Sequence, residues 1–90
     1  MKATVSFIGR TSIEISRREI EVELQDGARL TDLMNHLLEL LGPAAEATLV
    51  DRKRGGYTVL LSVNGMAANA STVLNDGDRV VVVPPTAGGT

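Results

Sequence analysis

The sequence contains no cysteine and no tryptophan, and it has only one histidine, one phenylalanine and one tyrosine among its 90 residues. Without cysteine there is no thiol nucleophile, no disulfide and no thiolate site for zinc or an iron–sulfur cluster. The single histidine, His36, has no second imidazole to complete a metal site, and we expect it to be a partly exposed helix residue. Two aromatic side chains are too few for the stacking platforms that bind single-stranded nucleic acid. The composition therefore predicts neither a metal site nor a nucleic-acid partner.

A strong charge of one sign and a long apolar run are also missing. The formal net charge is −2, which by itself implies no partner. The basic run Arg52-Lys53-Arg54 is interpreted as a solvated loop rather than as a phosphate-binding patch. The N-terminal residues interleave polar and apolar side chains, unlike a signal peptide, and no segment is long enough to cross a membrane. We therefore expect a cytoplasmic protein without a membrane partner.

No group of residues forms a convincing catalytic set. Gly55-Gly56 is not followed by the lysine and serine that complete a phosphate-binding loop. Asp76 and Asp78 flank Gly77 in a predicted tight turn, which accounts for both carboxylates without acid–base chemistry. The sequence therefore indicates a carrier or a substrate of other enzymes rather than an enzyme.

Polar and apolar residues alternate near the N-terminus with the period of a half-buried strand. This alternation covers residues 3–7 and returns over residues 19–24, where three glutamates form the solvated face. Residues 9–12 have the composition of a turn or loop, and Ile13 and Ile15 extend the alternation. Because the two strands are close in sequence, we expect them to form an antiparallel hairpin.

The apolar spacing then changes to the three-and-four pattern of one helical face. This face is formed by Leu30, Leu33, Met34, Leu37, Leu38 and Leu41. Thr31 is the expected N-cap, and Asp32 suits the positive end of the helix dipole. Gly42 is the expected stop, and Pro43 begins a second short helix that ends near Leu49.

Further strands are expected at residues 57–63, 66–68 and 79–83, separated by turns at Asn64-Gly65 and at residues 75–78. The last strand is apolar on both faces, which favours a central position between the first and third strands. One amphipathic helix must then lie across one face of a mixed sheet of four to five strands. This α+β order predicts a β-grasp domain over residues 1–83, followed by a flexible tail over residues 84–90.

The tail is narrow, and its composition has a physical reason. Proline cannot donate to a strand ladder, so Pro84-Pro85 ends the last strand and projects the chain away from the sheet. The residues that follow have small side chains or none, and glycine lets the backbone enter a channel too narrow for a side chain. They are Thr86, Ala87, Gly88 and Gly89. On composition alone, an inserted tail and an idle terminus are equally good interpretations.

The stretch DGDRVVVVPPTAGG, residues 76–89, resembles the C-terminal signature of the ThiS/MoaD family of sulfur-carrier proteins. The resemblance extends to Val63-Asn64-Gly65 and to the strand–strand–helix opening, so it covers essentially the whole chain. The Pro-Pro-x-x-Gly-Gly form of the tail is more similar to the small subunit of molybdopterin synthase than to the thiamine carrier. The family fold is a ubiquitin-like β-grasp, in agreement with the order of elements above.

The resemblance implies a carrier cycle in which the protein binds no cofactor of its own. An adenylating enzyme of the ubiquitin-activating type uses ATP to activate the carboxyl group of Gly89, and Gly88 lets this group pass a narrow channel. Sulfur from a persulfide then replaces AMP and gives a thiocarboxylate. A partner such as the large subunit of molybdopterin synthase accepts the sulfur for the molybdenum or tungsten cofactor. Amino-acid, thiamine or tRNA sulfur are the other destinations.

The resemblance also implies a docking surface on the open face of the sheet. By position, Phe7, Ala67 and Val83 are candidates for contact with the activating enzyme, and core packing is an equally good interpretation for Phe7 and Val83. The family often has an aromatic residue where this chain has Val83.

Thr90 follows Gly89, so the family chemistry requires a processing step. In some relatives a metalloprotease of the deubiquitinase type removes the residues beyond the glycine pair, and we expect cleavage between Gly89 and Thr90 here. Two alternatives stay open. Instead of a sulfur carrier, the protein is in one alternative a ubiquitin-like modifier that is joined to lysines through Gly89. In the other alternative it is a β-grasp interaction module that is never activated.

Overall fold

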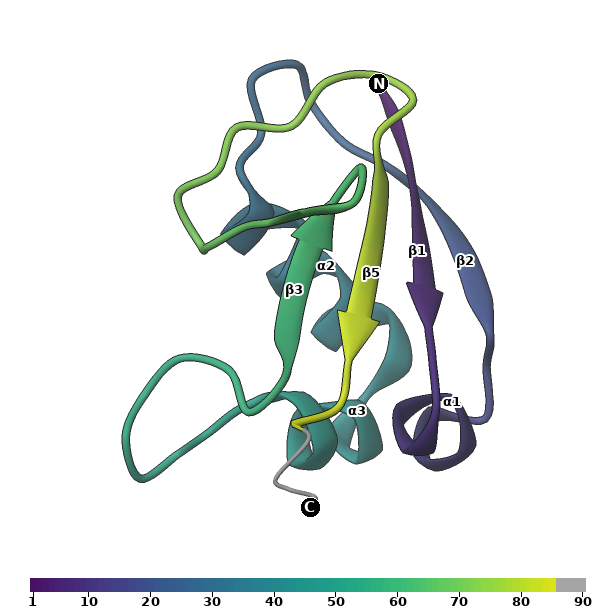
Figure 1. The fold of residues 1–90 in the computed structure, drawn as a ribbon, viewed down its shortest axis with the longest axis vertical. Helices are drawn as coiled ribbons and strands as arrows, with labels where there is room; N and C mark the ends of the chain where they lie inside the picture. The colour runs from purple at the N-terminus through teal and green to yellow at the C-terminus, as the bar shows by residue number, and fades with distance from the viewer. Residues whose placement is uncertain (86–90) are drawn as a thin grey trace.

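The computed structural model of the chain describes residues 1–85, and residues 86–90 lie outside the described part. Its elements, in chain order, are β1 (Lys2–Phe7), α1 (Arg10–Ile15), β2 (Glu19–Glu23), α2 (Leu30–Leu41), α3 (Pro43–Leu49), β3 (Leu60–Val63), β4 (Met66–Ala67) and β5 (Arg79–Val83). The strands form one mixed sheet in the order β2-β1-β5-β3-β4, and α2 lies across one face of it (Figure 1). The predicted α+β, β-grasp architecture is confirmed.

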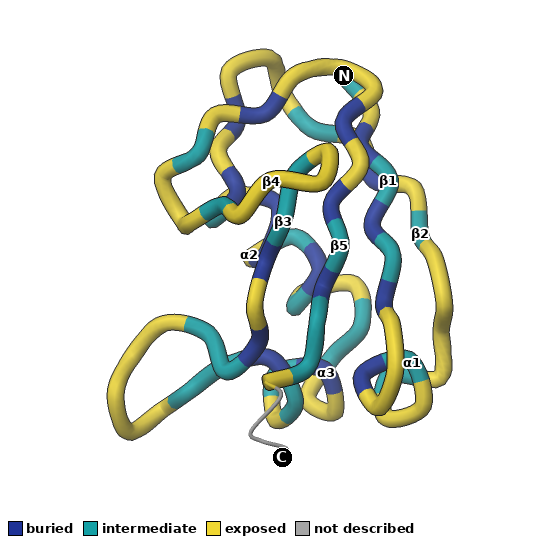
Figure 2. Tube along the Cα trace, viewed as in Figure 1, coloured by how far each residue is buried: buried dark blue, intermediate teal, exposed yellow. Residues whose placement is uncertain are grey.

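Strand β5 lies at the centre of the sheet, as its apolar character predicted. It pairs in parallel with β1 and antiparallel with β3. Val80 and Val82 are 0% exposed and pack in the core with Leu33 and Leu37 of α2. Figure 2 shows buried positions alternating with more exposed ones along β1 and β5, the pattern of a sheet covered on one face.

The connection between β1 and β2 differs from the expected turn and extended hairpin. The antiparallel pairing of β1 with β2 is confirmed, but residues 10–15 form the short helix α1. Hydroxyl groups favour this turn, because Thr11 Oγ1 donates to the Ile8 carbonyl at 2.5 Å and Ser12 Oγ donates to the Gly9 carbonyl at 2.8 Å. Ile13 lies in α1 and is 76% exposed, so the alternation of apolar and polar residues around it does not indicate a half-buried strand.

The two remaining helices agree with the sequence pattern except at one end. Helix α2 begins at Leu30, so Thr31 is not its N-cap. The carboxylate of Asp32 instead accepts a hydrogen bond of 2.8 Å from the backbone N–H of Arg29. Gly42 and Pro43 end α2 and begin α3 as predicted. Within residues 1–85, no helix is both long and apolar enough to cross a membrane.

Strand β3 is shorter than the predicted residues 57–63 and begins at Leu60. Residues 57 and 58 pair elsewhere, because Tyr57 bridges Val50 and the Thr58 N–H donates to the Leu49 carbonyl at 2.9 Å. The short strand β4 covers Met66–Ala67, and the turn before it has Asn64 and Gly65 at positive φ, as expected for a tight hairpin.

Asp78 anchors the start of β5. Its side chain is largely buried, with the residue 7% exposed, and it accepts hydrogen bonds from the Asn64 side-chain amide and the Asn75 N–H, both at 2.8 Å. The Asn64 oxygen in turn accepts from the Arg79 N–H at 2.9 Å. These hydrogen bonds connect the turn between β3 and β4 to the turn that precedes β5. The polar residues of both turns therefore have a structural role.

We expect Asp78→Ala to lower the free energy of unfolding by about 1–3 kcal/mol, because it removes the acceptor of two part-buried hydrogen bonds. Asp26→Ala is the matched control. The Asp26 carboxylate is 97% exposed, so its removal should change stability by less than about 0.5 kcal/mol. Urea unfolding followed by circular dichroism measures both values, and equal losses for the two variants would contradict the anchoring role of Asp78.

Candidate functional site

The chain leaves the sheet at the end of its central strand. Val83, the last residue of β5, still pairs with Leu60 of β3, and Pro84 and Pro85 follow it. Proline has no N–H to donate to a ladder, so the strand ends here. Pro84 is half-buried and Pro85 is exposed, so exposure rises as the chain departs from the sheet.

The base of the tail rests against the segment that follows β1. A Cβ atom on Gly9 would lie 3.4 Å from Cγ of Pro84, so the two residues are neighbours. Gly9 has a φ of 59°, a conformation open to glycine and strained for other residues. The Ile8 N–H also donates to the Val82 carbonyl at 3.3 Å. The tail is therefore held at its base from the β1 side as well as from β3.

The residues expected to carry the chemistry lie outside the described residues. These are Gly88 and Gly89 with the preceding Thr86 and Ala87, and Thr90 at the expected processing site. The described structure reaches the tail as far as Pro85.

Near the tail, the open face of the sheet is apolar over β3 and β5. Leu60 and Val83 are partners in the ladder between these strands, and Val81 lies on the same face two residues before Val83. Leu60 is 58% exposed, and the two valines are half-buried. We call Leu60, Val81 and Val83 the apolar patch. The apolar patch adjoins Pro84, at the base of the tail.

The other half of the open face, over β1 and β2, is polar. Arg79 Nη1 donates to Ser6 Oγ at 2.8 Å and to Glu19 Oε2 at 3.0 Å. Glu19, Glu21 and Glu23 are all exposed on β2, which is an edge strand of the sheet. The interpretation of these glutamates as a solvated face is confirmed, and charges on an edge strand also discourage pairing with another chain.

The structure corrects one predicted docking residue. Phe7 is 3% exposed and belongs to the hydrophobic core, because alternate residues of β1 point toward the helices. Its side chain therefore does not lie on the open face. Ala67 is exposed on β4, and Val83 lies at the base of the tail, so the docking role of these two residues stays a prediction.

Sequence reasoning missed Leu60 and Val81. Both lie in runs that are apolar on both faces, and such runs do not reveal which residues face the core. The positions of their neighbours decide it: Val59 and Leu61 are 6% and 8% exposed, which leaves Leu60 on the other face. The pairing of Leu60 with Val83 is the signal that was needed, and it comes from the sheet register.

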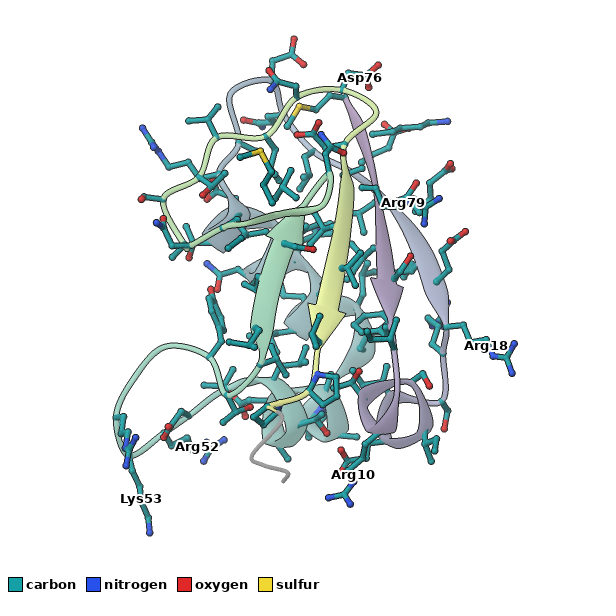
Figure 3. The ribbon with its side chains drawn as sticks, viewed as in Figure 1. Arg10, Arg18, Arg52, Lys53, Asp76 and Arg79 are labelled. Atoms are coloured by element: carbon teal, nitrogen blue, oxygen red, sulfur yellow. The ribbon has the colours of Figure 1, made fainter. Side chains whose placement is uncertain are left out.

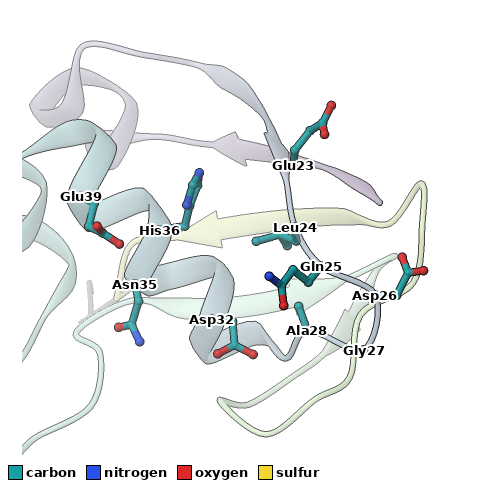
Figure 4. A pocket seen from close by; sticks show the side chains of 10 residues that line it. All are labelled: Glu23, Leu24, Gln25, Asp26, Gly27, Ala28, Asp32, Asn35, His36 and Glu39. Carbon is teal, nitrogen blue, oxygen red and sulfur yellow. The ribbon is translucent and has the colours of Figure 1, made fainter.

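A groove of about 530 Å³ lies between the end of β2 and helix α2, and Figure 4 shows its lining. His36 lines it and is partly exposed, as predicted from the sequence. Asp32, also in the lining, caps α2. Among residues 1–85, no three histidine, aspartate or glutamate side chains gather closely enough to hold a metal ion.

Comparison with known proteins covers almost the whole chain. The family model described as the ThiS family matches residues 8–89. The chain belongs to the ThiS family. The match places this ThiS family member among small carrier proteins.

The solved structures similar to it include the following three. SAMP1 from Haloferax volcanii aligns with a TM-score of 0.87 and 21% identity over 99% of this chain and 100% of that one. Putative molybdopterin converting factor subunit 1 from Pyrococcus furiosus aligns with a TM-score of 0.72 and 28% identity, over 94% of this chain and 98% of that one. A complex of subunits 1 and 2 of the molybdopterin-converting factor from Helicobacter pylori aligns with a TM-score of 0.65 and 21% identity, over 94% of this chain and 95% of that one. The two likenesses at 21% identity show the fold alone.

Proposed function

We propose that this protein is a sulfur carrier in which the carboxyl group of Gly89 is adenylated and then converted to a thiocarboxylate. The observation that carries the proposal is the extent of the family match, which ends at Gly89 and so includes the glycine pair. The tail that presents this pair follows directly from the central strand of the sheet. A folded body with a narrow terminal arm suits a protein that delivers its end into the active sites of other proteins.

The chemistry needs partners that supply its energy and its sulfur. A carboxylate is a poor acyl donor, so a carboxylate oxygen of Gly89 attacks the α-phosphorus of ATP and releases pyrophosphate. A persulfide sulfur of the donor attacks the acyl carbon of this mixed anhydride, and AMP leaves. A thiol then cleaves the resulting acyl disulfide and gives the thiocarboxylate. ATP is bound by the adenylating enzyme, and this chain holds no cofactor.

Gly89 has no free carboxyl group while Thr90 is attached to it. Hydrolysis of the peptide bond between these residues, by a metalloprotease of the deubiquitinase type, precedes adenylation. Water supplies the second carboxylate oxygen in that step.

The sulfur is most readily assigned to the molybdenum or tungsten cofactor. The relative from Pyrococcus furiosus is described as a molybdopterin converting factor subunit, and its 28% identity is the highest of the three likenesses above. The Helicobacter pylori structure contains subunits 1 and 2 of such a factor. We accordingly assign a second, sulfur-accepting subunit as the partner in the cytoplasm, and the apolar patch together with Ala67 as the docking surface for partners.

We expect only the chain that ends at Gly89 to be activated at the full rate. With the adenylating enzyme of the same organism and ATP, chains ending at Gly88 or at Thr90 should release pyrophosphate at least about 100-fold more slowly, because the carboxyl group is displaced from the reacting position. A chain that retains Thr90 and reacts as fast as the chain ending at Gly89 would contradict the proposal.

The products separate this proposal from its rivals. A thiocarboxylate on Gly89 supports the carrier. Adducts to lysines of other proteins through Gly89, without a thiocarboxylate, support a ubiquitin-like modifier. Full partner binding by a chain that lacks Gly88 and Gly89, with no adenylation of the longer chain, supports a plain interaction module.

The docking surface is tested by Leu60→Glu, which places a charge in the apolar patch. We expect the KM for this carrier in adenylation to rise about tenfold, as for a residue at the centre of an interface. Leu40→Glu is the control, because Leu40 is 55% exposed on α2, away from the open face, while Leu60 is 58% exposed. Steady-state pyrophosphate release gives both values, and a similar rise for the two variants would refute the patch as a docking site.

A further inference from the structure

Basic side chains gather at the end of the molecule from which the tail leaves. Figure 3 shows Arg10, Arg52 and Lys53 at this end of the long axis, and Asp76 at the opposite end. Arg10 follows Gly9, which lies against Pro84. The basic run that sequence analysis interpreted as a solvated loop is thus placed at the end of the molecule where the described chain stops, at Pro85.

The small net charge conceals a strong separation of charge along the molecule. Residues 9–18 hold three arginines and one glutamate, and residues 50–56 hold three basic residues and one aspartate. Each of these two segments therefore carries a net charge of +2. The rest of the chain has nine acidic and three basic residues, a net charge of −6, within an overall −2. A partner that approaches the tail end meets a cationic surface on an otherwise anionic protein.

The loop between α3 and β3 is closed by its own backbone. The Asp51 N–H donates to the Gly56 carbonyl at 3.0 Å, and the Gly55 N–H donates to the Asp51 carbonyl at 2.8 Å. The Asp51 carboxylate accepts from the N–H groups of Lys53 and Arg54 at 3.1 and 3.0 Å. The one acidic side chain of the loop is therefore used within the loop itself.

Lys53 and Arg54 are the available charges of this loop. Arg52 forms an ion pair with Glu46 of α3. Both Lys53 and Arg54 are exposed, and among the described residues neither forms an ion pair. Their presentation on a closed loop reduces the conformational freedom that binding would otherwise remove.

The loop lies at the end of the molecule where β5 ends (Figure 1). Residues 85–89 span at most about 18 Å when fully extended. The mouth of a channel that contains Gly89 must therefore lie within that distance of Pro84. The loop leads directly into β3, whose first residue, Leu60, pairs with Val83 at the base of the tail. A partner that holds the tail therefore approaches the end of the molecule that carries the loop.

We propose that Lys53 and Arg54 contact carboxylate side chains at the rim of the channel in which the adenylating partner receives the tail. This inference rests on the proposed function. It assigns to the adenylating partner an acidic rim around the channel that receives the tail. An acidic protein surface is favoured over nucleic acid because the two aromatic residues of the chain do not form a platform. Phe7 is buried, and the half-buried Tyr57 is hydrogen-bonded to Thr31 through its hydroxyl group at 3.3 Å.

The test compares binding of the chain ending at Gly89 to the purified adenylating enzyme of the same organism. The double variant Lys53→Gln/Arg54→Gln should raise Kd about threefold to tenfold at about 0.05 M salt. The difference should disappear at about 0.5 M salt, where charges are screened over a few ångströms. Unchanged affinity at low salt, or a loss that persists at high salt, would overturn the proposal.

Lys2→Gln is the matched control for charge. Lys2 is exposed on β1 at the end of the sheet far from the tail, and its backbone N–H, not its side chain, binds Asp76. Its Kd should stay within about twofold of the unaltered chain. An equal loss for Lys2→Gln would assign the effect to net charge and overturn the role of the loop.

A second measurement separates failure of this inference from failure of the proposed function. Hexaglutamate peptide is titrated into the isotope-labelled protein, and the amide NMR signals of residues 52–56 are followed. These signals should shift, and the double variant should lose the shift. If the adenylating enzyme does not activate the unaltered chain, the proposed function fails while this titration still decides on the loop. No shift with the peptide, or stronger binding of a hexanucleotide RNA, would overturn the acidic-rim partner.

Discussion

The structure depends on the pairing of β5 between β1 and β3. Hydrogen bonds join β5 to a neighbouring strand on each side, and the side chains of its Val80 and Val82 are fully buried. Each buried valine contributes about 1.5–3 kcal/mol relative to an exposed side chain, so this strand is costly to displace. Asp78 fixes one end of β5 and Pro84 ends the other. The tail therefore starts from a strand that the rest of the domain holds in place.

Two surfaces near Pro84, where the tail leaves the sheet, have different proposed roles in partner binding. The apolar patch gives an area whose burial favours association, and the cationic loop adds charges that act over a longer range. The acidic edge strand β2 lies on the far side of β1 from both of them. In the proposed complex, a partner that engages the tail meets apolar and basic surface near Pro84 and acidic surface farther away, and this asymmetry would orient the approach of the two proteins.

Much of this arrangement was predictable from the sequence, and the exceptions have physical causes. The apolar run before the proline pair and the three-and-four spacing after residue 29 were strong local patterns, so β5 and the buried face of α2 agreed with expectation. Helix α1 was missed because Ile13 and Ile15 mimic strand alternation while hydroxyl-to-carbonyl bonds favour a helical turn. The sequence left Phe7 open between docking and core packing, and Leu60 was overlooked, because long-range pairing decides which side of a strand faces the core. The position of the basic loop, residues 50–56, at the end of the molecule where β5 ends likewise depends on tertiary structure.

The most direct test of the account is the intact mass of the protein isolated without a tag from its own cells. The account predicts molecules that end at Gly89, a fraction of which carry sulfur in place of one carboxyl oxygen. If every molecule retains Thr90 in cells that require the cofactor, Gly89 is never free, and the proposal that this chain carries sulfur is contradicted.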